Sequence, residues 1–86
     1  MLSATGIKTD IGNRILHTLV QSGWRVDYAY PDTMIDKGVD FDRYKISKAA
    51  ESLEFEWDNW EEWQICGTPD SMLRICADFG VSLDQR

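Results

Sequence analysis

The alternation of apolar and polar residues between positions 53 and 66 constrains the fold most strongly. Leu53, Phe55 and Trp57 alternate with Glu54 and Glu56. A period of two places apolar and acidic side chains on opposite faces of a β-strand. The segment is therefore predicted to be a strand with one buried face and one acidic face.

A second strand is predicted over 63–66, so the two strands form a β-hairpin. Two registers are open for this hairpin. A two-residue turn would place Trp57 opposite Trp60, whereas a five-residue loop over 58–62 would place Trp57 opposite Trp63. The longer loop keeps the apolar side chains of both strands on one face, and we expect that register.

Two amphipathic helices flank this central region. Asp10 is predicted to cap a helix over residues 10–22, and Gly23 supplies the left-handed conformation at its end. Thr68 and Pro69 form a strong start signal for a second helix, which Gly80 ends. Each helix carries its apolar side chains on one arc, so both are expected to pack on a core.

The other segments give weaker signals. Apolar and polar residues alternate over 24–30, which predicts a half-buried strand. Residues 39–52 are ambiguous: Tyr44 and Ile46 fit a short strand, but we expect irregular chain followed by a short helix. Residues 1–9 lack periodicity and are predicted to be a flexible N-terminal arm.

The resulting element order predicts the architecture. We expect residues 1–86 to form a single small α+β domain with two layers. Its three-stranded, mostly antiparallel sheet, which includes the hairpin, would be covered on one face by the two amphipathic helices. A chain of 86 residues is too short for two independent cores.

Charge and composition exclude several classes of function. The net charge is -6, with 15 acidic against 9 basic residues, which argues against direct nucleic-acid binding. Apolar runs are too short to span a bilayer, and no secretory signal is visible, so we expect a cytoplasmic protein without a membrane partner. The two cysteines, Cys66 and Cys76, are predicted to be reduced and buried.

No residue pattern indicates catalysis, a cofactor or a metal. His17 is the only imidazole, and it falls on the polar arc of the first helix. Asp36, Asp40 and Asp42 lie close in sequence but lack the spacing of a calcium-binding loop. The protein is therefore not expected to be an enzyme.

The acidity is confined to one segment, where it indicates a surface that binds a protein. Residues 27–62 carry a net charge of -7, compared with +2 for 1–26 and -1 for 63–86. Aromatic anchors framed by steering charges are typical of protein interfaces. The candidate partner-binding residues are Asp36, Asp40, Asp42, Glu54, Glu56, Trp60, Glu61 and Glu62.

These residues suggest a small protein-binding module of the inhibitor, immunity or anti-defence type, directed at a basic protein surface. One version has the carboxylates mimic the phosphates of a nucleic acid. Trp60 is expected at the loop tip, either as a lid over the hairpin or as a partner anchor. The alternative function is a structural or assembly protein that forms a homo-oligomer through a sheet edge.

Overall fold

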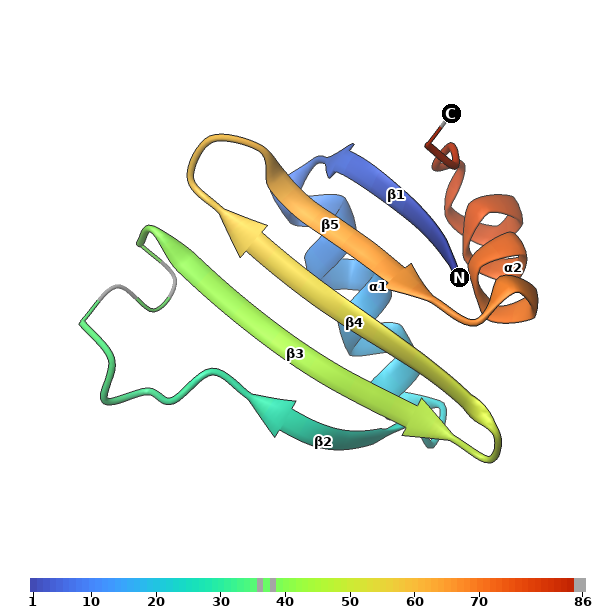
Figure 1. Cartoon of the computed structure of the whole chain (residues 1–86), viewed down its shortest axis with the longest axis horizontal. Helices are drawn as coiled ribbons and strands as arrows, with labels where there is room; N and C mark the ends of the chain where they lie inside the picture. The colour runs from blue at the N-terminus through green and yellow to red at the C-terminus, as the bar shows by residue number, and fades with distance from the viewer. Residues whose placement is uncertain (36, 38, 85–86) are drawn as a thin grey trace.

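A computed structural model describes residues 1–35, 37 and 39–84, in which five antiparallel strands form one sheet and two helices pack against one face (Figure 1). The elements are β1 (Leu2–Ile7), α1 (Thr9–Gln21), β2 (Arg25–Ala29), β3 (Phe41–Lys48), β4 (Glu51–Asp58), β5 (Glu62–Gly67) and α2 (Pro69–Phe79). The strand order is β1-β5-β4-β3-β2. Helix α1 therefore carries the chain from one edge of the sheet to the other.

The prediction of a three-stranded sheet is wrong, because two segments without a clear strand pattern also join the sheet. Residues 1–9, predicted as a flexible arm, contain β1, which pairs with β5. Residues 39–52, predicted as irregular chain and a short helix, contain β3 and the turn into β4. The α+β class and the two helices are confirmed.

The register of the β4–β5 hairpin is the one expected. Trp57 pairs with Trp63, and Asp58 also pairs with Glu62, which leaves a turn of three residues. Glu62 adopts a φ of 64°, a left-handed conformation that lets a short turn join two antiparallel strands. The alternate residues of the two strands therefore share one apolar face, formed by Leu53, Phe55, Trp57, Trp63 and Ile65.

The core lies between that apolar face and the two helices. Its largest fully buried side chains come from α1, three strands and α2, and are Ile15, Ile46, Leu53, Phe55, Ile65 and Met72. The rings of Trp63 and Phe55 pack in a T-shaped arrangement, with centroids 5.9 Å apart and an interplanar angle of 82°. Both helices contribute to one continuous cluster, so both cover the same face.

The helix ends differ in part from the expectation. Helix α1 begins at Thr9, and Asp10 is not its cap. Helix α2 begins at Pro69 and ends at Gly80, whose φ of 69° is left-handed as predicted. The Thr68 hydroxyl makes no cap bond, because it exchanges hydrogen bonds with the backbone of Ser52 instead.

Strand β2 does not keep the simple alternation expected for residues 24–30. Val26 pairs with Ile46 on the helix-covered side, whereas Tyr28 pairs with Lys45 on the opposite side. A register shift between Val26 and Tyr28 causes this change of face. All five residues of β2 are exposed, so the strand is not half-buried.

Candidate functional site

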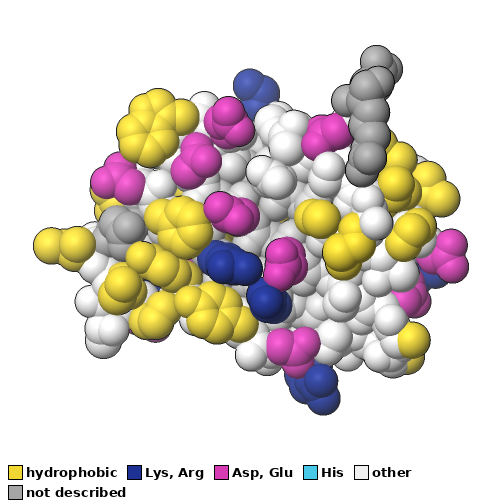
Figure 2. Space-filling view, in the orientation of Figure 1, with side chains coloured by type: hydrophobic (Ala, Val, Ile, Leu, Met, Phe, Trp, Pro, Cys, Tyr) yellow, Lys and Arg dark blue, Asp and Glu magenta, His cyan; other side chains and the backbone are white. Residues whose placement is uncertain are grey.

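The uncovered face of the sheet carries the acidic side of β4, but basic residues of β3 lie beside it. Lys45 is opposite Glu54, and its Nζ lies 3.1 Å from Glu54 Oε1. Arg43 Nη2 lies 3.5 Å from the same oxygen. Figure 2 shows these mixed charges near the middle of the face. The acidic strand face predicted from β4 alone is therefore largely neutralised by β3.

A similar pairing occurs on β2. Arg25 Nε lies 2.7 Å from Asp27 Oδ1. Hydrogen bonds from Ser47 and Arg25 lower the pKa of the Asp27 carboxyl. This carboxylate is therefore already occupied by neighbouring donors of the sheet.

Exposed apolar and acidic side chains gather at one end of the sheet. They belong to the β2–β3 connection and the β4–β5 turn, which meet where Asn59 N–H donates to Asp40 O at 3.3 Å. We call this surface the acidic end, formed by Asp32, Met34, Ile35, Val39, Asp40, Trp60 and Glu61. Figure 2 shows hydrophobic and acidic side chains together on this side of the molecule.

The turn that presents Trp60 is held by its own carboxylate. Asp58 Oδ1 accepts hydrogen bonds from the backbone N–H groups of Trp60, at 2.9 Å, and Glu61, at 2.7 Å. The Trp60 residue is 80% exposed. It is therefore not a lid over the hairpin, and its ring projects from a turn of defined geometry.

Glu62, a predicted partner-binding residue, is engaged inside the fold. Its Oε2 accepts hydrogen bonds from Thr9 N–H at 2.6 Å and from the Thr9 hydroxyl at 3.0 Å. The Thr9 hydroxyl also accepts a bond of 2.9 Å from Trp57 Nε1. The carboxylate thus satisfies a free N–H group at the start of α1 and places negative charge at the positive end of the helix dipole.

Asp42 also points away from the exposed surface. Its Oδ1 accepts hydrogen bonds of 2.9 Å from Lys37 Nζ and from Arg43 N–H, and its Oδ2 accepts a longer one of 3.3 Å from the Tyr44 hydroxyl. Although burial alone would lower it, hydrogen bonds with Asp42 and Tyr44 raise the pKa of Lys37. Lys37 was not among the predicted residues, and its place in this cluster depends on the path of the connection.

The predicted partner-binding residues that the structure describes therefore lie in three places. Asp40, Trp60 and Glu61 meet at the acidic end, whereas Glu54 and Glu56 lie on the uncovered sheet face. Asp42 and Glu62 serve internal contacts. Asp36 lies outside the described residues.

A groove runs between α1 and the helix-facing side of β2 and β3, where the sheet extends beyond the helices. It encloses about 270 Å³ and is lined by Asn13, Leu16, His17, Val20, Val26, Asp42, Tyr44 and Trp63. An adjoining hollow of about 160 Å³ shares three of these residues and adds Thr9 and Trp57. The sequence does not predict this groove, because the apolar arc of α1 is expected to pack entirely on the core.

The remaining candidates show no shared chemistry. The imidazole of His17 is exposed at the rim of the groove. Cys66 and Cys76 are free and half-buried, and burial raises the pKa of the Cys76 thiol. Within the described ranges, no three His, Cys, Asp or Glu side chains lie close enough together to hold a metal ion.

The chain matches no protein-family model, and no curated protein or solved structure matches it either. Neither helix in the described residues is long and apolar enough to cross a bilayer. The acidic end and the groove are therefore the features that bear on function.

Proposed function

We propose that this protein is a non-catalytic protein-binding module whose acidic end engages a basic surface on a partner protein. The proposed class is that of inhibitor, immunity or anti-defence proteins. The observation that carries the proposal is the exposure of Trp60 and Ile35, at 80% and 99%, beside the carboxylates of Asp40 and Glu61.

Trp60 would anchor the partner protein. Tryptophan is the residue type most enriched among binding hot spots, because its ring buries a large area at a low cost in side-chain entropy. The hydrogen bonds that Asp58 accepts from Trp60 N–H and Glu61 N–H hold the turn before a partner arrives. A preorganised turn lowers the ordering cost of binding, which favours an anchor role.

The carboxylates of Asp40 and Glu61 would steer a basic partner toward the acidic end. Asp40 and Glu61 are exposed at the acidic end, and Lys37, the cation of the same connection, is held by Asp42. Glu54 is compensated by Lys45 on the sheet face. The uncompensated charge therefore lies around Trp60, where it would accelerate association with a basic surface.

The test begins with affinity capture from native cells, followed by association rates with the purified captured protein at several salt concentrations. We expect Trp60→Ala to weaken binding about 30-fold, which corresponds to a hot spot of about 2 kcal/mol. The double variant Asp40→Lys, Glu61→Lys should reduce the association rate and its dependence on salt.

Matched controls use the exposed face of α2. Leu73→Ala removes another exposed apolar side chain, and Asp70→Lys with Asp78→Lys reverses two charges away from the acidic end. These variants should bind like the wild type. Equal binding by Trp60→Ala, or an association rate that is indifferent to salt, would refute the proposal.

The second candidate is a homo-oligomer joined through β2. Among the described strands, β2 has no neighbour on its outer side. The other edge is partly covered, since Asp84 N–H donates to Ser3 O and Thr5 N–H donates to Asp84 Oδ1, both at 2.9 Å. The register shift at Asp27 and the flanking charges oppose edge pairing. A monomeric mass at micromolar concentration would exclude this candidate.

A further inference from the structure

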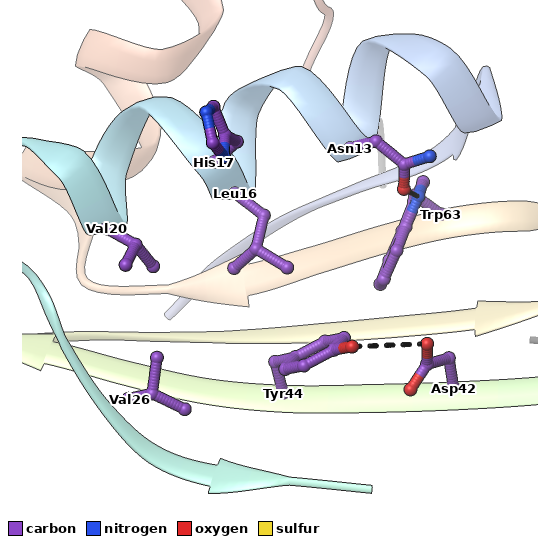
Figure 3. Close-up of a pocket in the computed structure, with 8 residues that line it drawn as sticks. All are labelled: Asn13, Leu16, His17, Val20, Val26, Asp42, Tyr44 and Trp63. Atoms are coloured by element: carbon purple, nitrogen blue, oxygen red, sulfur yellow. Dashed lines mark hydrogen bonds between the residues drawn. The ribbon is translucent and has the colours of Figure 1, made fainter. Parts of the chain in front are cut away.

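The groove between α1 and the edge of the sheet has apolar walls and one polar end. Leu16 and Val20 point from α1 toward Tyr44 and Val26 on the strands below, as Figure 3 shows. Trp63 closes the polar end beside Asn13, whose Oδ1 accepts its indole N–H at 2.9 Å. The His17 ring points away from the groove.

The polar end contains a carboxylate with spare capacity. Asp42 is largely buried, with a side chain 15% exposed. Its Oδ1 already accepts two short hydrogen bonds, whereas the bond that reaches Oδ2 from the described residues is the 3.3 Å contact from Tyr44. A carboxylate oxygen can accept two hydrogen bonds, so Oδ2 can take a further donor.

Lys37 leaves one acceptor of Asp42 open to a ligand. Its Nζ has three donors, which reach Tyr30 O, Asp42 Oδ1 and the Tyr44 hydroxyl. The same ammonium also lies 3.7 Å from Asp32, whose side chain is 94% exposed. Lys37 therefore pairs with Asp42 and has no donor left for an anionic ligand, whereas Asp42 Oδ2 can still accept a hydrogen bond from a cationic one.

The walls near Asp42 are aromatic. The rings of Tyr44 and Trp63 lie with centroids 6.3 Å apart, and Trp57 lines the adjoining hollow. Aromatic faces attract cations through their quadrupole, most strongly when the cation is partly desolvated. Lys37 Nζ already lies 5.0 Å from the centre of the Tyr44 ring. The environment therefore favours a cationic group over a neutral or anionic one.

We infer that the groove binds a small organic cation, namely a primary ammonium carried on an apolar group. The ammonium donates to Asp42 Oδ2, and the apolar group lies among Leu16, Val20 and Val26. The groove volume of about 270 Å³ lies just below the ~300–1,000 Å³ of most small-molecule sites, so a small ligand suits it.

This inference does not depend on the proposed function, because the residues that line the groove are outside the acidic end. The test is a two-dimensional NMR titration with 2-phenylethylammonium, followed at the Trp63 indole N–H. Two analogues of the same size, 2-phenylethanol and phenylacetate, separate charge from apolar contact at constant ionic strength.

The ammonium should give saturable shifts at millimolar concentrations. The alcohol should bind about tenfold more weakly, and the carboxylate should not bind, because Asp42 repels it. Equal binding of the ammonium and the alcohol, or no saturation with the ammonium, would overturn the inference.

Two variants test the position of the ligand. Asp42→Asn removes the charge and should weaken ammonium binding about tenfold. Because this change also removes the partner of Lys37, Val20→Phe provides an independent test: it fills the groove from α1 and leaves the polar cluster intact. Leu73→Phe, at an exposed position of α2 outside both the groove and the acidic end, is its control. Unchanged ammonium binding by a folded Val20→Phe would refute the site.

Discussion

Replacement of Gly12 by alanine tests how closely α1 lies against the sheet. In an isolated helix this change stabilises by about 1 kcal/mol, because glycine loses more backbone entropy than alanine. In this protein a Cβ at Gly12 would lie 2.8 Å from Trp63 Cβ and closer still to the indole ring. Ordinary carbon contacts begin near ~3.5 Å, so the helix or the ring would have to move by about 1.4 Å.

Trp63 cannot move without losing other interactions. Its Nε1–H donates to Asn13 Oδ1, and its ring packs in a T-shaped arrangement with the ring of Phe55. The contacts at Gly12 are so close that we expect the upper end of the ~1–3 kcal/mol range for overpacking, about 2–3 kcal/mol, which exceeds the gain of about 1 kcal/mol in helix propensity. We expect Gly12→Ala to destabilise the protein by about 1–2 kcal/mol net, or to lower Tm by about 4–16 °C for a domain of this size.

Urea and thermal unfolding measure the effect, with Thr18→Ala on the exposed side of α1 as the control. Thr18→Ala should be neutral or slightly stabilising. The cost of Gly12→Ala should decrease in a Trp63→Ala background, where the indole ring is absent and only the Cβ contact remains. A Gly12→Ala variant as stable as the wild type would refute the packing argument.

Three further predictions follow from individual side chains. Glu62→Ala should cost about 1–2 kcal/mol in urea unfolding, because Thr9 N–H loses its acceptor, whereas Glu61→Ala should be neutral. Hydrogen bonds from Thr5 and Ser3 lower the pKa of Asp84, so its stabilisation is complete above the unfolded value of ~3.9 and is lost as pH falls through the folded value. The difference in Tm between wild type and Asp84→Asn should therefore shrink as pH falls below the unfolded value of ~3.9. Because burial raises the pKa of Cys76, its thiol should react slowly with a thiol reagent at mildly alkaline pH, and faster once urea unfolds the protein; fast reaction in the native protein would contradict this.

The sequence predicts those elements whose local pattern agrees with their tertiary role. The β4–β5 register follows from the alternation over 53–57 and from the need to keep Trp57 and Trp63 on one face. Helix α2 begins after Thr68 and ends at Gly80, because proline and glycine act locally at helix ends. These signals do not depend on distant parts of the chain.

The two missed strands depend on their neighbours. Strand β1 is held by pairing with β5 and by the hydrogen bond that Thr5 N–H donates to Asp84. Because distant residues hold the strand, its small residues show no strong alternation of apolar and polar side chains. Strand β3 ends in a turn at Ala49, whose φ of 55° is unusual for alanine. A run rich in alanine and serine favours a helix locally, but pairing with β2 and β4 overrides that preference.

The candidate site was predicted only in part for a related reason. Carboxylates were identified by their sequence positions, but their availability depends on which cations the fold brings to them. Without β3 in the sheet, nothing in the sequence indicated that Lys45 would compensate Glu54. The exposure of Ile35 likewise depends on the path of the β2–β3 connection, which has no periodic pattern.

Glu62 connects the turn that presents Trp60 with the start of α1. Its left-handed backbone ends the turn that presents Trp60, and a non-glycine residue in this conformation costs of order 1 kcal/mol. Its carboxylate offsets that cost by binding Thr9, which in turn accepts the Trp57 indole N–H and lines the hollow beside the groove. The position of the turn and the start of α1 are therefore set by the same hydrogen bonds.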